Sequence, residues 1–154
     1  MLLGRSDPPL SAEGRAQSLA LRVDAVRFYT STMRRARETA ALAARGRPIF
    51  EWPELAETSL GVWDGLSWSE IERHWPDLAA AKLQNWFGVT PPGGESWEDL
   101  CARVEKVLRL IRLGPSPCAV VAHVAVNAAL AYVIAGQDPL SFHQEYCDLS
   151  TYEY

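Results

Sequence analysis

The chain has 154 residues, of which 48% are hydrophobic and 22% are charged, and its formal net charge is −4. These values are typical of one globular domain over residues 1–154, and the acidic excess argues against a nucleic-acid surface, which is usually basic. No apolar run approaches the roughly 20 residues that span a bilayer, and we expect neither membrane insertion nor a signal peptide. The cysteines Cys101, Cys118 and Cys147 are odd in number and widely spaced, which indicates reduced thiols in a cytoplasmic protein.

The first third of the chain alternates between helical and extended patterns. Ser11 is a suitable N-cap for a helix over residues 12–23. Apolar residues at spacings of three and four predict the inner face of this helix, which comprises Ala16, Leu19, Ala20 and Val23. β-Branched and aromatic residues predict a strand over 25–31, and an Ala-, Arg- and Glu-rich stretch predicts a helix over 33–44. A second, short strand is expected over residues 48–51.

The remainder of the chain continues the alternation. Helical patterns cover residues 67–81, where Pro76 is expected to break or kink the helix, and residues 97–113. The continuous apolar run over 118–123 is typical of a strand buried on both faces, and a helix over 126–135 follows it. A last strand is expected over 150–154. Strands alternating with helices predict a three-layer α/β/α sandwich with a mainly parallel central sheet.

Three features lie where ligands bind such sheets, at the carboxyl ends of the strands. The first feature is the segment 31–35, where a strand ends and a helix begins; the start of a helix favours a bound anion. On this helix Arg34 and Arg37 share one face, while Arg35 points elsewhere. The alternative for this segment is a solvated basic face. His123 closes an apolar strand just before a helix, and Glu57 lies in a glycine-containing loop. Taken alone, a histidine in the place of His123 is more often structural than catalytic, and Glu57 would be one surface carboxylate among many.

Five segments together resemble the histidine phosphatases of the phosphoglycerate-mutase-like superfamily, in the family's order and spacing. They are residues 4–14, 31–40, 55–65, 92–96 and 120–123. The short chain resembles the small phosphatases of this superfamily, such as alpha-ribazole phosphatase, more than the mutases. The resemblance implies the phosphoglycerate-mutase-like fold and a phosphomonoesterase that acts on a small organic phosphate through a phosphohistidine.

The resemblance also implies roles for individual residues. Arg35 resembles the phosphate-binding arginine, and His123 resembles the second histidine, which donates to a phosphate oxygen. Glu57 resembles the general acid that protonates the departing alcohol, which requires a raised pKa. Glu95 and Ser96, at a loop-to-helix junction, suggest a cap or a supporting role. We expect no metal and no organic cofactor. The expected partner is a small phosphorylated metabolite or inorganic phosphate, and the sequence leaves open whether the chain forms a homodimer.

The sequence also departs from the family pattern. The Arg-His-Gly triplet that carries the nucleophilic histidine occurs nowhere in the chain, and Val124 and Ala128 replace a glycine and an arginine usual after the second histidine. We expect the first strand of the sheet to be missing and the chain as given to be inactive. One interpretation is a phosphatase whose sequence continues upstream of Met1, and the other is a non-catalytic pseudophosphatase or anion-binding module. A domain swap or a partner strand could also fill the missing strand's place.

All six tryptophans fall within one third of the chain, at positions 52, 63, 68, 75, 86 and 97. In the family this region covers the pocket. The rings could form an aromatic wall for a ring-bearing phosphate ester, or they could pack a lid onto the sheet. We expect packing for most of them, with one or two rings facing the ligand.

Overall fold

The computed structural model describes residues 1–153 and is built on a three-stranded parallel sheet. Strand β1 (Arg27–Thr30) lies in the middle, between β2 (Ile49–Glu51) and β3 (Cys118–Val121). Phe28 is in register with Ile49 of β2 and with Ala119 of β3. The strand expected over residues 118–123 ends at Val121. His123 therefore lies two residues beyond the strand and is the N-cap of the next helix.

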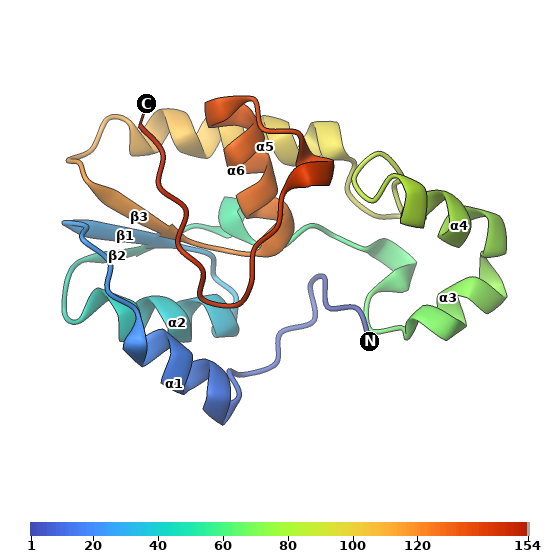
Figure 1. Cartoon of the computed structure of the whole chain (residues 1–154), viewed down its shortest axis with the longest axis horizontal. Coiled ribbons are helices and arrows are strands. Elements are labelled where there is room, and N and C mark those ends of the chain that lie inside the picture. The colour runs from blue at the N-terminus through green and yellow to red at the C-terminus, as the bar shows by residue number, and fades with distance from the viewer. Residues whose placement is uncertain (154) are drawn as a thin grey trace.

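Helices cover both faces of this sheet (Figure 1). Helices α1 (Ala12–Ala20) and α2 (Arg34–Ala44) pack together on one face, and α5 (Trp97–Ile111) and α6 (Val124–Ala135) pack together on the other. Two short helices, α3 (Trp68–His74) and α4 (Pro76–Gln84), lie beyond the carboxyl ends of the strands. We call α3, α4 and the loop that follows them to residue 96 the lid. The expected three-layer α/β/α architecture is confirmed, and Pro76 breaks the expected helix by beginning α4.

Two apolar clusters join the layers. One packs the sheet against α5 and α6 and includes Tyr29, Leu100, Val104 and Val126. The other packs the opposite face against α2 and is centred on Phe28, which is fully buried. Arg35 lies in α2 and His123 directly precedes α6. Because these two helices pack in the apolar clusters, the core fixes the backbone at both residues.

The predicted inner face of α1 was wrong. Leu19 is 54% exposed, whereas Ser18 is fully buried and its hydroxyl lies 3.4 Å from that of Thr39 in α2. Ser18, rather than the predicted apolar residues, is therefore the buried residue of α1 and faces α2, while Ala16 and Ala20 are exposed. The helix also ends three residues early, because Leu21 is extended and the last carbonyls accept from the Arg22 and Arg45 side chains.

The last predicted strand was also wrong for residues 150–153, which form no strand; residue 154 lies outside the described residues. Residues 149–152 and the strand β3 both line a cavity of about 1300 Å³. Paired strands lie about 4.8 Å apart, and a segment that has no neighbouring strand at this distance forms no sheet, whatever its residue preferences.

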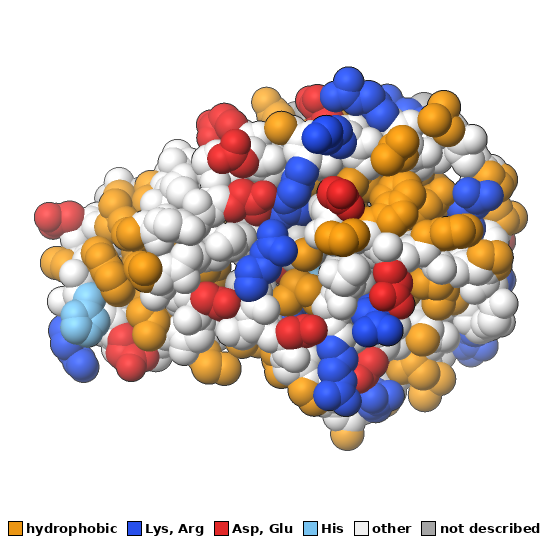
Figure 2. All heavy atoms as spheres, turned by 180° about the vertical axis from the view of Figure 1, so that it is seen from behind, with side chains coloured by type: hydrophobic (Ala, Val, Ile, Leu, Met, Phe, Trp, Pro, Cys, Tyr) orange, Lys and Arg blue, Asp and Glu red, His pale blue; other side chains and the backbone are white. Residues whose placement is uncertain are grey.

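The surface carries charges of both signs. On the face shown in Figure 2, basic side chains are interrupted by acidic ones and by hydrophobic ones. Several surface charges of the chain are paired, for example Arg37 with Glu51 at 2.9 Å and Arg34 with Glu38 at 2.7 Å. In the described part of the chain, no helix combines the length and the apolar character needed to cross a bilayer.

Candidate active site

Arg35 lies in the first turn of α2, just beyond the carboxyl end of β1. Its guanidinium donates to the carbonyls of Ser6, at 2.7 Å, and Gly4, at 3.2 Å, and the Asp7 carboxylate lies 3.6 Å away. A guanidinium carries five N–H donors, so these two hydrogen bonds leave donors for an anion. The side chain is 19% exposed, which leaves it accessible while its orientation is held.

The start of α2 already has an anion of its own. The Arg34 amide donates to Asp7 Oδ2 at 2.7 Å, so a carboxylate lies at the positive end of the helix dipole. Asp64 in turn accepts from the amides of Gly4, Arg5 and Ser6, at 2.8, 3.1 and 2.9 Å. These contacts hold the N-terminal segment against the candidate site.

His123 is the N-cap residue of α6 and is only 7% exposed. Burial, and to a lesser extent the positive charge of Arg35, lower the pKa of its imidazole to about 3, while Asp7 acts in the opposite direction. The imidazole is therefore neutral at pH 7 and carries one N–H donor.

Glu57 lies in the loop after β2, and its carboxyl behaves in the opposite way. Burial raises its pKa, and this effect exceeds the opposing effects of the amides of Thr58 and Ala125 and of the charge of Arg35. The Thr58 amide donates to Glu57 Oε1 at 2.8 Å. The carboxyl therefore keeps its proton to a higher pH than a solvated glutamate does, as a general acid requires.

We expect Glu57→Gln to raise the free energy of unfolding at pH 7 by roughly 1 kcal/mol, the scale of burying a poorly compensated polar group. A raised pKa in the folded state means that ionising Glu57 opposes folding, and the neutral amide removes this cost. The gain should shrink as the pH falls through the range where the carboxyl of the unfolded chain is protonated. Urea denaturation from pH 3.5 to 7 measures it; the exposed Glu98→Gln should change stability by less than about 0.5 kcal/mol. A gain independent of pH would contradict this account.

The structure brings the three predicted site residues together. Arg35, Glu57 and His123 all line the 1300 Å³ cavity, and the charge of Arg35 acts on both of the others. Among residues 1–153, no three His, Cys, Asp or Glu side chains converge as metal ligands do. The arrangement can bind an anion and supply a proton.

Two supporting residues were missed by the sequence analysis. Arg103 of α5 forms a bidentate ion pair with Glu95, with N···O distances of 2.6 and 2.8 Å, and it also donates to the Glu54 carbonyl. Burial raises the pKa of Glu95, but the hydrogen bonds and charge of Arg103 bring it below its usual value. Ser31 bonds His123 directly. The signal for Ser31 was its place in a family segment, whereas nothing in the local pattern distinguished Arg103.

The supporting role suggested for the 95–96 junction has a structural counterpart. Ser96 caps α5 by accepting from the Asp99 amide at 3.1 Å. Glu95 holds Arg103, and the positive charge of Arg103 lowers the pKa of both Glu57 and His123.

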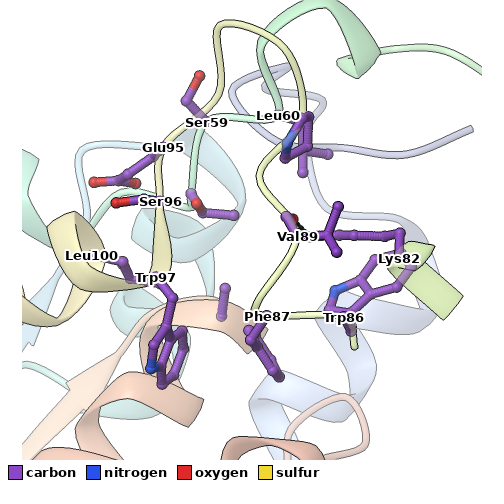
Figure 3. A pocket seen from close by; sticks show the side chains of 13 residues that line it. Ser59, Leu60, Lys82, Trp86, Phe87, Val89, Glu95, Ser96, Trp97 and Leu100 are labelled. Carbon is purple, nitrogen blue, oxygen red and sulfur yellow. Dashed lines mark hydrogen bonds between the residues drawn. The ribbon is translucent and has the colours of Figure 1, made fainter. Parts of the chain in front are cut away.

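The six tryptophans lie in different surroundings. Trp63 packs against Trp68 and Trp75, with ring centroids 6.3 and 6.2 Å apart, and Trp52 packs against Tyr29 of β1. Trp86 and Trp97 instead line a small cavity of about 30 Å³ between the lid and α5 (Figure 3).

A buried lysine accompanies these rings. Lys82 is 6% exposed; its Nζ donates to the Val89 carbonyl at 2.6 Å and lies 5.1 Å from the centre of the Trp86 ring. Figure 3 shows it beside Trp86, with Phe87 and Trp97 below and Ser59 on the opposite side of the cavity. Burial lowers the pKa of this lysine to about 8. The cavity also touches Thr58 and so borders the loop that carries Glu57.

The fold and the site agree with a match to a known family. The model of the histidine phosphatase superfamily (branch 1) matches residues 1–154. The chain therefore belongs to this superfamily, as its five segments predicted.

Proteins similar to this chain include some with phosphatase names. The chain is 30% identical over 135 residues to rat (Rattus norvegicus) 6-phosphofructo-2-kinase/fructose-2,6-bisphosphatase 1. The matched region covers 83% of this chain and 28% of that relative. It thus spans under a third of the length of the curated relatives it matches.

Solved structures show the same fold. Bacillus stearothermophilus YhfR has a TM-score of 0.82 and 27% identity, over 94% of this chain and 78% of that one. Mycobacterial glucosyl-3-phosphoglycerate phosphatase in complex with inorganic phosphate has a TM-score of 0.77 and 27% identity, over 89% and 74%. Alpha-ribazole phosphatase from Shigella flexneri, at 24% identity and a TM-score of 0.75 over 92% and 74%, shows the fold alone.

Proposed function

We propose that the cavity lined by Arg35, Glu57 and His123 binds the phosphoryl group of a small organic phosphate. The observation that carries this proposal is that these three side chains line one cavity. A guanidinium and a neutral imidazole supply N–H donors there, and burial raises the pKa of the Glu57 carboxyl beside them. Phosphate oxygens accept from such donors, and a planar guanidinium can bind two of them at once. The phosphate-bound mycobacterial relative supports the proposal.

The chemistry that this site serves is phosphate monoester hydrolysis through a phosphohistidine. A histidine nitrogen forms a bond to phosphorus while the ester P–O bond breaks, and Glu57 gives its proton to the departing alcohol oxygen. Water then attacks phosphorus and gives a proton to the Glu57 carboxylate, the N–P bond breaks and inorganic phosphate leaves. Arg35 and His123 bind the phosphoryl oxygens in both steps and stabilise the charge that develops on them.

The nucleophile is the part of this mechanism that the chain does not supply. Its other histidines, His74 and His143, are both exposed and neither lines the cavity. His123 is bonded through Nε2 to Ser31. We therefore propose that the 154-residue chain alone binds phosphate and phosphate esters without hydrolysing them. The same observation favours a second candidate, a non-catalytic anion-binding module.

Two measurements on the purified chain test the proposal. Calorimetric titration with inorganic phosphate should show binding at a single site, and p-nitrophenyl phosphate should bind without being hydrolysed. Turnover that disappears in His123→Ala would make His123 the nucleophile and overturn the role given to it here. No phosphate binding at all would overturn the proposed function. Hydrolysis restored by a separately added peptide containing Arg-His-Gly would favour the phosphatase over the anion-binding module.

A further inference from the structure

We propose that Ser31 is a positioning residue that holds His123 in one neutral tautomer, with its proton on Nδ1. The inference deepens the proposed function, because it specifies which imidazole nitrogen donates to the phosphate. It can nevertheless be tested on the unliganded chain.

The geometry involves a buried hydroxyl between two partners. Ser31 follows β1 directly and is fully buried. Its Oγ lies 2.7 Å from His123 Nε2, and the Met33 amide donates to the same Oγ at 3.2 Å. The described residues offer this hydroxyl no other hydrogen-bond partner within reach.

Counting donors and acceptors assigns the proton positions. A serine hydroxyl has one donor and two acceptor lone pairs, and the Met33 amide occupies one lone pair. If Nε2 also carried a proton and donated to Oγ, the hydroxyl proton would be buried without an acceptor, which is costly. If the hydroxyl donates to Nε2, every group is satisfied. Nε2 is then the acceptor, and the single imidazole proton lies on Nδ1.

This arrangement has two consequences for anion binding. The Nδ1–H is the donor left for a phosphoryl oxygen beside Arg35. A hydroxyl that donates to Nε2 also disfavours the imidazolium form, in which both nitrogens carry protons. The low pKa of His123, caused by burial and by the charge of Arg35, acts in the same direction.

The alternative is a purely structural serine. By accepting from the Met33 amide two residues later, Ser31 closes a turn between β1 and α2, a common use of serine. That role requires only the lone pair and leaves the imidazole free to exchange tautomers. The two roles therefore predict different nitrogen spectra for His123.

The decisive measurement is a two-bond ¹H–¹⁵N correlation spectrum of the wild-type chain at pH 7. The chain has three histidines, and His123 is assigned as the one whose signals are lost in His123→Gln. We expect a protonated Nδ1 and an unprotonated Nε2. A protonated Nε2, or an averaged pair of nitrogens as in free histidine, overturns the inference even if phosphate binds.

Variants extend the test. Ser31→Ala should give a mixture of tautomers and about tenfold weaker phosphate binding, the effect of one lost hydrogen bond. Ser31→Thr keeps the hydroxyl and should restore both the Nδ1–H tautomer and the affinity. If Ser31→Ala folds and its His123 spectrum matches the wild type, the positioning role is wrong. If the wild-type chain shows the Nδ1–H tautomer but binds no phosphate, the proposed function fails while the assignment of the tautomer holds.

Discussion

Arg35→Ala should weaken the binding of inorganic phosphate by about 100-fold. Charge-assisted hydrogen bonds contribute about 1.5–3 kcal/mol, and the loss of 2.7 kcal/mol corresponds to a factor of about 100 in the dissociation constant. Arg35 is partly buried, lines the cavity and is held in place by the carbonyls of Ser6 and Gly4, so little orientation is lost when an anion binds. Isothermal titration calorimetry with wild type and variant measures the effect.

A neighbour on the same helix provides the matched control. Arg37 is 51% exposed and pairs with Glu51, away from the cavity, so Arg37→Ala should leave the affinity within about twofold. Arg35→Lys should fall between the two variants, because an ammonium keeps the charge but loses the planar fork. Equal affinities for Arg35→Ala and wild type would show that the residue does not bind the anion.

Acid should destabilise the chain through His123 by about 1.4 kcal/mol per pH unit between about pH 6 and pH 4. The pKa of its imidazole is about 3 in the folded chain and about 6.5 in the unfolded one, so in this window the unfolded chain binds the proton. The stabilisation is complete above pH 6.5 and is lost as the pH falls toward 3. Urea denaturation at several pH values gives the slope.

The difference between variants isolates this one group from the carboxylates. His123→Gln should show a flatter dependence of unfolding free energy on pH than the wild type, whereas the exposed His143→Gln should follow the wild type. Parallel curves for His123→Gln and wild type would mean that the imidazole has the same pKa in the folded and the unfolded chain. That result would contradict the depressed pKa of His123 on which this prediction rests.

Local pattern accounts for most of the elements but not for their packing. The strand at 118–121 and the helix at 34–44 formed within the ranges where they were expected, because apolar pattern and helix propensity are properties of short segments. The prediction for the inner face of α1 was wrong because close packing against α2 buries Ser18 and leaves Leu19 exposed. Residues 150–153 failed because a strand requires a neighbouring strand, which composition does not specify.

In the candidate site, too, some residues could be predicted from the sequence and others could not. The resemblance to the family pointed to Arg35, Glu57 and His123 as site residues, and the ends of parallel strands are where such residues meet. The roles of Arg103 and Ser31 depend on partners 8 and 92 residues away in the chain, and local spacing carries no information about such contacts.

By itself, the sequence determined the class of fold, the family and three of the residues that line the cavity. Only the tertiary structure decided their chemical states. Burial beside Arg35 leaves His123 neutral, and burial of Glu57 favours its protonated form, although both are ordinary titrating residues in an unfolded chain. The physical reason is that the cost of removing a charge from water, and the field of neighbouring charges, depend on surroundings that exist only after folding.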